Sequence, residues 1–237
     1  MADPILSVIL PCYNESKGLA NILKRFQEYG QGVDFELILV DNGSTDRSAE
    51  VLATLLPSYP FARTVRVEKN VGYGHGILTG LQAARGELLA WSHADLQTDP
   101  ADVFRALRLY QNEPGAVPRL VKGRRNGRSL QERIISRGME IVSFLLLRTR
   151  LTEINAQPKL FHRRLLENLP HPPTDFNFDV YVLYQARQKR WRIEAFDVIF
   201  PPRRYGQSNW AASWRSKLRT IAHSMWFMFK LGFGWAR

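Results

Sequence analysis

The sequence has a single cysteine, Cys12, among its 237 residues. One thiol excludes an internal disulfide framework and is too few for a structural zinc cluster, which fits a cytosolic chain. Long hydrophobic runs are also missing, because the longest, such as residues 144–147, fall far short of the roughly 18 to 20 apolar residues that a membrane span requires. The N-terminus has no basic segment followed by an apolar one, so we expect no secretory signal.

Acidic residues are scarce in one half of the chain. The net charge of +11 divides unevenly, since residues 1–114 carry 10 Lys and Arg against 14 Asp and Glu, whereas residues 115–237 carry 23 against 8. The second half, at +15, therefore predicts an anionic partner: nucleic acid, anionic lipid headgroups or a phosphorylated substrate. A solvated basic face without a partner is the alternative.

The chain is 45% hydrophobic, which predicts a globular fold. Residues 6–10 and 35–40 read as buried strands, and between them apolar residues recur at helical spacing from Leu19 to Phe26. We expect further helices over residues 44–56, 70–85, 100–112, 130–148 and 178–188, and further strands over 64–67, 87–91, 119–123, 156–161 and 192–200. Alternating strands and helices predict an α/β fold with a doubly wound, mainly parallel sheet.

The C-terminal residues combine aromatic and cationic side chains. Apolar residues fall at intervals of three and four, interspersed with cations: Trp210, Trp214, Leu218, Ile221, Met225 and Phe229, with Arg215, Lys217, Arg219 and Lys230. This pattern predicts an amphipathic, Trp-rich helix over residues 210–237, after an α/β domain over residues 1–209. The composition is typical of a helix that lies in a membrane interface. Docking on the domain's own core and a contact in a homodimer remain alternatives.

Metal-capable side chains follow the expected strand at residues 87–91. Asp95 and Gln97 are two residues apart, so both can face one cation, and His93 is a third candidate ligand. Hard oxygen ligands suit Mg²⁺ or Mn²⁺, and an imidazole favours Mn²⁺. A cation held by so few protein groups requires further ligands, typically the oxygens of a diphosphate. A polar turn without a ligand is the alternative.

Two other loops are expected at the same edge of the sheet. Residues 11–15 follow the first strand and residues 41–46 follow the second, and both contain carboxylates. Ligands of open α/β sheets bind at the carboxyl ends of the strands, where such carboxylates can accept hydrogen bonds from a ribose or a base. Alternatively, Glu15 and Asp46 are only charges at helix starts.

Several motifs in order resemble family 2 glycosyltransferases of the GT-A fold. They are Val8-Ile9-Leu10-Pro11-x-Tyr13-Asn14-Glu15, Val40-Asp41-Asn42-Gly43-Ser44-Thr45-Asp46, Asn70-x-Gly72-x-Gly74, Ala94-Asp95-Leu96-Gln97-x-Asp99-Pro100, Gln157-x-Lys159-Leu160-Phe161, Phe178-Asp179-Val180 and Arg203-Arg204-Tyr205-Gly206-Gln207-Ser208. Within the family, the chain resembles the branch of dolichyl-phosphate mannose synthase and bacterial polyprenyl-phosphate glycosyltransferases. The resemblance covers roughly residues 5–209.

The resemblance implies inverting transfer from a UDP- or GDP-sugar, with Mg²⁺ or Mn²⁺ at Asp95 and Gln97. It also implies a phosphate site near Arg203. The expected nucleotide-binding residues are Pro11, Tyr13, Glu15, Asp41, Asn42, Asn70, Gly72 and Asp95. Two residues depart from the family pattern, because His93 stands where an Asp is usual and Asn42 where a second Asp is common.

The chemistry of the nucleophile helps to choose between two classes of acceptor. A sugar hydroxyl requires a general base, whereas a lipid phosphate is already an anionic nucleophile and requires cations to position it. We therefore expect a polyprenyl phosphate acceptor bound at basic residues: Arg124, Arg125, Arg203, Arg204 and Ser208. The catalytic candidates are Asp95, Asp179 and Arg204.

These inferences predict a cytoplasmic enzyme at the inner face of an anionic membrane. A saccharide hydroxyl as acceptor, with Asp179 as base, is the second hypothesis. A non-catalytic protein that binds nucleic acid or an anionic surface is the third. We expect no nucleic acid, because the aromatic residues of the tail fall at helix period, which suits a membrane interface better than base stacking.

Overall fold

The computed structural model describes residues 3–113, 115, 117–127, 130–201 and 214–234. Seven strands form one sheet: β1 Leu6–Cys12, β2 Phe35–Asn42, β3 Ala62–Val67, β4 Leu88–Trp91, β5 Arg119–Asn126, β6 Lys159–His162 and β7 Arg192–Ile199. The α-helices are α1 Leu19–Tyr29, α2 Ser48–Leu55, α3 Tyr73–Ala83, α4 Pro100–Asn112, α5 Leu130–Leu147, α6 Phe178–Gln188 and α7 Trp214–Gly232.

The strand order is β3-β2-β1-β4-β6-β5-β7. β1 pairs in parallel with β2 and β4, β2 with β3, and β5 with β7. Within the described residues β6 alone runs antiparallel, inserted between β4 and β5. The predicted doubly wound, mainly parallel sheet is confirmed, and the sequence did not indicate the orientation of β6.

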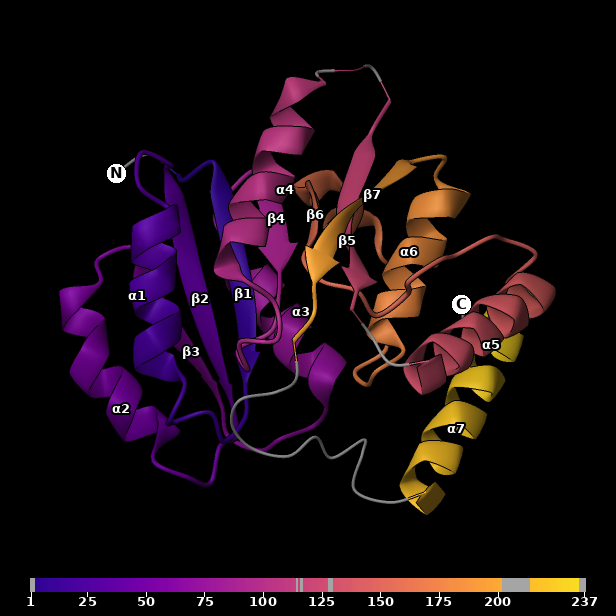
Figure 1. Cartoon of the computed structure of the whole chain (residues 1–237), viewed down its shortest axis with the longest axis horizontal. Helices are drawn as coiled ribbons and strands as arrows, with labels where there is room; N and C mark the ends of the chain where they lie inside the picture. Colours follow the sequence, from indigo (N-terminus) through magenta and orange to yellow (C-terminus); the bar gives the residue numbers. More distant parts are fainter. Residues whose placement is uncertain (1–2, 114, 116, 128–129, 202–213, 235–237) are drawn as a thin grey trace.

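Helices cover both faces of the sheet (Figure 1). On one face, α1, α2 and α4 pack their apolar side chains against the strands in a core that includes Phe26, Leu52 and Phe104. On the other face, α3 and α6 form a second core, which continues into α5 and α7 through Leu147 and Met228. The central strands are buried on both faces, which explains why they read as continuous apolar runs rather than as alternating ones.

Local signals set several helix boundaries. Helix α4 spans the predicted residues because Asp99 accepts a hydrogen bond from the backbone N–H of Ala101 and Pro100 occupies the first helical turn. The helix predicted over residues 44–56 is shorter than expected, because α2 begins at Ser48. The carboxylate of Asp46 accepts hydrogen bonds from the N–H and hydroxyl of Ser48, so residues 44–47 form a polar turn instead.

The strand expected over residues 119–123 is a second correction, because it is longer than the sequence predicted. Strand β5 continues to Asn126, because each residue from Arg119 to Asn126 pairs with a residue of β7. The arginines of this segment therefore lie on a strand, and successive side chains point to opposite faces. Arg124 and Arg125, which were expected to bind a phosphate together, therefore lie in different environments.

The C-terminal helix packs against α5, and the two helices lie side by side at one end of the molecule (Figure 1). Gly232 lies so close that an added Cβ would be 2.2 Å from the carbonyl oxygen of Leu146. Met228 and Leu231 are buried, whereas Met225 and Trp226 are exposed. One face of α7 thus docks on the protein and another remains uncovered. The expected boundary between residues 209 and 210, and Trp210 itself, lie outside the described residues.

Candidate active site

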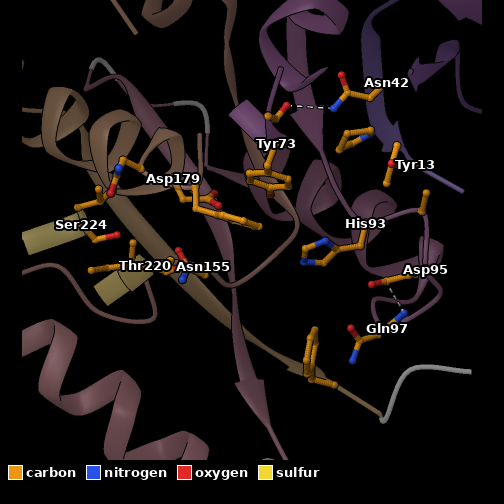
Figure 2. Close-up of a pocket in the computed structure, with 18 of the residues that line it drawn as sticks. Tyr13, Asn42, Tyr73, His93, Asp95, Gln97, Asn155, Asp179, Thr220 and Ser224 are labelled. Atoms are coloured by element: carbon orange, nitrogen blue, oxygen red, sulfur yellow. Dashed lines mark hydrogen bonds between the residues drawn. The ribbon is translucent and has the colours of Figure 1, made fainter. Parts of the chain in front are cut away.

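A cavity of about 670 Å³ opens at the carboxyl ends of β1, β2 and β4. It continues across the sheet to α5 and α7, so a single space joins the loops after the strands to the C-terminal helix pair. Figure 2 shows Asp95 and Gln97 at one end, Thr220 and Ser224 at the other, and Tyr73 and His93 between them. This volume lies within the range of ordinary small-molecule sites.

Seven of the eight residues expected to bind a nucleotide line this cavity: Pro11, Tyr13, Glu15, Asn42, Asn70, Gly72 and Asp95. Asp41 does not belong to the lining. Its carboxylate folds back to accept a hydrogen bond from the backbone N–H of Ser44 at 3.0 Å, and it lies 3.8 Å from the guanidinium of Arg66. Asp41 therefore holds the turn that follows β2.

The loops after β1 and β2 are fastened to each other. The side-chain oxygen of Asn14 accepts hydrogen bonds from the backbone N–H groups of Thr45 at 2.8 Å and Asp46 at 3.2 Å. Asp46 in turn accepts from the N–H of Ser16 at 3.2 Å. These bonds fix one wall of the cavity before any ligand binds, which reduces the entropic cost of binding.

The loop before α3 requires glycine. Gly72 has a φ of +148°, and an added Cβ would lie 2.5 Å from the carbonyl oxygen of Thr174. The amide of Asn42 donates to the carbonyl of Gly72 at 3.0 Å, which ties this loop to the end of β2. The segment around Thr174 can thus pack against the start of α3, where Phe176 stacks on the ring of Tyr73.

The metal-capable loop after β4 supplies one carboxylate and one imidazole to the cavity, from Asp95 and His93. The Oδ1 of Asp95 accepts a hydrogen bond from the backbone N–H of Gln97 at 3.0 Å, and the amide of Gln97 donates to the carbonyl of Pro201 at 3.2 Å. Among the described residues, no three His, Cys, Asp or Glu side chains gather as a complete metal site. This donor set fits a hard cation that takes its other ligands from a diphosphate.

His93 is half-buried between aromatic rings. Its ring lies 6.5 Å from that of Tyr73 and 6.4 Å from that of Phe200, centroid to centroid. Burial lowers the pKa of His93, although the charge of Asp95 acts in the opposite direction. The neutral imidazole, which is the form that can ligate a metal, is therefore favoured.

A buried polar cluster lies beneath the middle of the cavity. Asp179, at the start of α6, lines the cavity and forms an ion pair with the ammonium of Lys159 on β6. Gln157 donates through Nε2 to Asp179 at 3.0 Å and to the hydroxyl of Tyr73 at 3.1 Å. Burial, followed by the charge of Asp179 and a hydrogen bond to it, raises the pKa of Tyr73, which therefore stays a phenol at neutral pH.

The expected phosphate-binding residues are separated. Arg125 lines the cavity, where it lies over the ring of Phe200 and contacts the carboxylate of Glu153 at 3.0 Å. Arg124 points elsewhere and pairs with Asp197 at the surface. Arg203, Arg204 and Ser208 lie outside the described residues.

Several residues of the lining were not anticipated from sequence. On the side of the cavity far from Asp95 they are Ser136 and Met139 of α5, Asn155, and Thr220 and Ser224 of α7. Thr220 and Ser224 are four residues apart, so they fall on the same side of a helix. That spacing was a usable signal, because it placed a hydroxyl stripe inside an otherwise apolar and cationic helix.

A family comparison agrees with this architecture. The profile described as "Glycosyl transferase family 2" matches residues 7–176. Among curated proteins, the chain is 38% identical over 104 residues to an undecaprenyl-phosphate 4-deoxy-4-formamido-L-arabinose transferase of Edwardsiella ictaluri, a match that covers 42% of this chain and 32% of the relative. The enzyme of the same name from Pseudomonas aeruginosa is 38% identical over 106 residues, which cover 43% and 31%. The match thus spans about a third of the length of these relatives.

Solved structures share the fold. The glucosyl-3-phosphoglycerate synthase of Mycobacterium tuberculosis, in complex with Mn²⁺, UDP and glucosyl-3-phosphoglycerate, superposes with a TM-score of 0.73 at 19% identity over 98% of this chain and 80% of that one. A mannosyltransferase of Pyrobaculum calidifontis, in complex with GDP-mannose and Mn²⁺, gives a TM-score of 0.63 at 22% identity over 86% and 59%.

The profile match covers more than two thirds of the chain and includes the loops after β1, β2 and β4, which form the donor end of the cavity. By both sequence and architecture, this protein belongs to glycosyl transferase family 2.

Proposed function

We propose that this protein transfers one sugar from a UDP- or GDP-sugar to a polyprenyl phosphate at a membrane surface, with inversion at the anomeric carbon. One observation carries the proposal: a single cavity extends from the carboxyl ends of the strands to α5 and α7, and the outer face of these helices is apolar and cationic. The curated relatives act on undecaprenyl phosphate, which supports an acceptor of this class.

The donor is proposed to bind at the end of the cavity formed by the loops after β1, β2 and β4. Glu15 and Asn42 accept hydrogen bonds from the nucleoside. The loop before α3, which contains Gly72, holds the sugar diphosphate close to the backbone. Asp95, together with Gln97 and His93, would hold Mg²⁺ or Mn²⁺, as solved relatives hold Mn²⁺ with UDP or GDP-mannose. When bound, the cation supplies positive charge to the departing diphosphate.

The acceptor enters from the other end. Among the described residues, Arg125 is the Lys or Arg side chain that lines the cavity. Its guanidinium is suited to a phosphate because it can donate two parallel hydrogen bonds. A phosphate oxygen is held on the face of the sugar opposite the leaving diphosphate, which produces inversion. We propose that Arg203, Arg204 and Ser208 add to this site.

The membrane contact is proposed to be the outer face of α5 and α7. Exposed apolar side chains gather there: Leu130, Ile134, Ile141, Phe144 and Leu145 on α5, and Leu218, Met225 and Trp226 on α7. Arg133, Arg137 and Arg219 are exposed on the same helices, and Lys230 lies over the ring of Trp226. Aromatic and basic side chains together favour an anionic bilayer interface. None of the helices within the described ranges is long and apolar enough to cross a bilayer.

We expect the double substitution Phe144→Ser and Trp226→Ser to weaken binding to vesicles of phosphatidylglycerol and phosphatidylcholine at least tenfold. Both side chains are 54% exposed, so the change removes apolar area without opening the core. Vesicle co-sedimentation measures the effect. Ile5→Ser, which removes an exposed apolar side chain far from these helices, is the matched control.

Unchanged vesicle binding in the double variant would contradict the membrane contact. If sedimentation velocity instead shows that the wild type is a dimer and the double variant a monomer, the same face joins two subunits.

The proposed activity is tested with radiolabelled UDP- and GDP-sugars and a short-chain polyprenyl phosphate in detergent, with Mg²⁺, Mn²⁺ or EDTA. We expect a glycolipid product that EDTA abolishes. Hydrolysis of the donor without a lipid product would contradict the polyprenyl phosphate acceptor and favour a saccharide hydroxyl.

A further inference from the structure

A second cavity, of about 690 Å³, lies beside the active site, between the end of β5 and α5. Four arginines and two glutamates are the charged residues of its described lining: Arg124, Arg125, Arg133, Arg137, Glu140 and Glu153. Arg125 also lines the active-site cavity, whereas the other five lie outside that cavity. We call this second cavity the arginine pocket. Its volume is in the range of sites for small molecules and headgroups.

The two carboxylates of the arginine pocket are largely buried and already bind protein donors. The side chains of Glu140 and Glu153 are each 13% exposed. Glu153 accepts a hydrogen bond from the guanidinium of Arg125 at 3.0 Å, and Glu140 accepts one from the backbone N–H of Glu153 at 2.9 Å. A cation would have to displace these donors. The pocket is therefore not suited to a cation.

The arginines, in contrast, reach solvent. The side chain of Arg137 is 70% exposed although it contacts Glu140 at 3.1 Å, and Arg124 is exposed beside Asp197. Exposed ion pairs of this kind contribute little to stability, so their guanidinium groups can turn to another anion. The pairs of the pocket leave Arg133 without a carboxylate among the described residues. These guanidinium groups favour a phosphate, to which each can donate two parallel hydrogen bonds.

The arginine pocket borders the exposed apolar side chains of α5. Arg133 and Arg137 are four residues apart, so they lie on the same side of the helix. Arg137 follows Ile134 by three residues and precedes Ile141 by four, and these spacings make it a neighbour of both on the helix surface. Ile134 and Ile141 are both exposed. A phosphate in the pocket therefore has apolar side chains beside it, along which acyl chains can lie.

We propose that the arginine pocket binds the phosphate headgroup of one anionic phospholipid that is not a substrate, with its acyl chains along the exposed apolar side chains of α5. This inference rests on the proposed function, which brings α5 to a membrane, and it adds one discrete headgroup site to a general attraction between basic residues and a bilayer. The site differs from that of the acceptor, whose phosphate must reach the sugar in the active-site cavity. A headgroup held by Arg124, Arg133 and Arg137 lies outside that cavity.

The experiment titrates dihexanoyl phosphatidylglycerol, below its critical micelle concentration, into the protein in a calorimeter, so that no bilayer is present. We expect one lipid to bind per wild-type chain. In the double variant Arg133→Gln and Arg137→Gln the affinity falls roughly tenfold or more, because charge-assisted hydrogen bonds to the phosphate are lost. The matched control, Arg108→Gln and Arg219→Gln, removes the same net charge outside the pocket and binds the lipid like wild type. All four replaced side chains are exposed, so both variants keep the fold.

Equal affinities in the two double variants would overturn the site, because the attraction would then come from net charge alone. Displacement of the lipid by short-chain polyprenyl phosphate would also overturn it, since the pocket would then belong to the acceptor. Glycerol 3-phosphate separates the two sources of a phosphate ester: if it binds as tightly as the lipid, the pocket takes a soluble ester instead. These titrations contain no donor sugar. If the lipid binds as expected but wild type makes no glycolipid, the proposed function fails and the headgroup site stands.

Discussion

Replacing Asp95 by asparagine reduces sugar transfer at least a thousandfold. Asp95 is the carboxylate of the cavity at the carboxyl end of β4, and Asn is nearly isosteric, so the loop keeps its shape while the negative charge is lost. A neutral amide holds Mg²⁺ or Mn²⁺ far more weakly than a carboxylate does. Without that cation, the charge that develops on the departing diphosphate loses its main stabilisation, which is typically worth several kcal/mol.

The measurement is kcat and KM for the donor over a range of Mn²⁺ concentrations. Asp102→Asn is the matched control, because Asp102 is a partly buried carboxylate of the following helix that does not line the cavity. We expect the control to keep its transfer rate. An Asp95→Asn variant with a rate close to wild type would show that the reaction does not depend on a cation at this loop.

The position of Asp95 is an example of what the sequence could establish. In an alternating β/α chain, the loops that follow parallel strands lie at the same edge of the sheet. Glu15, Asn42 and Asp95 could therefore be expected to lie close together from the sequence alone. The expectation depended on the order of the elements rather than on side-chain contacts. It therefore places the loops at one edge but does not tell which side chains face the cavity, as Asp41 shows, whose carboxylate accepts a hydrogen bond from its own loop.

The far half of the site was less accessible to sequence reasoning. Strand β6 runs antiparallel between β4 and β5, and short apolar strands carry no signal of direction. That insertion brings Lys159 to Asp179, a contact between residues 20 apart in the sequence. Sequence reasoning weighed Asp179 as a base, and in the structure its carboxylate forms an ion pair with Lys159 of β6.

Helix α7 illustrates the same limit. Its amphipathic period was visible in the sequence, but docking on the protein's own core and exposure to a membrane were weighed as alternatives. In the structure one face of the helix docks on the protein, where Met228 is buried in the second core, and another face leaves Trp226 exposed to solvent. A period of 3.6 residues identifies a face, whereas the partner of that face depends on tertiary packing.

The second large expected effect is that the buried Lys122 makes the free energy of unfolding depend on pH. It is 1% exposed, and its ammonium donates to the carbonyl oxygens of Gly123 at 2.9 Å and Thr152 at 3.2 Å. Burial first, and then the charge of Lys159, lower the pKa of Lys122 to about 7. The unfolded chain keeps a lysine pKa of about 10.4. Between these two values the unfolded state binds a proton that the folded state does not.

The free energy of unfolding therefore rises with pH over this window, by up to about 1.4 kcal/mol per pH unit. The penalty is fully present below pH 7, where it reaches the order of 4 kcal/mol, and it disappears as the pH approaches 10. Lys122→Met removes the titrating group, so its stability curve is flatter over the same range. Relative to wild type, the variant gains stability as the pH falls from 10 to 7.

Urea unfolding at pH 7, 8.5 and 10 measures both slopes, with Lys24→Met as the control because Lys24 is exposed on α1. Parallel curves for wild type and Lys122→Met would mean that the ammonium stays charged when folded, held by the two carbonyl oxygens and the nearby carboxylate of Glu153. A slope in Lys122→Met smaller than in wild type but still positive is expected, because the buried Lys159 also has a lowered pKa and contributes with the same sign.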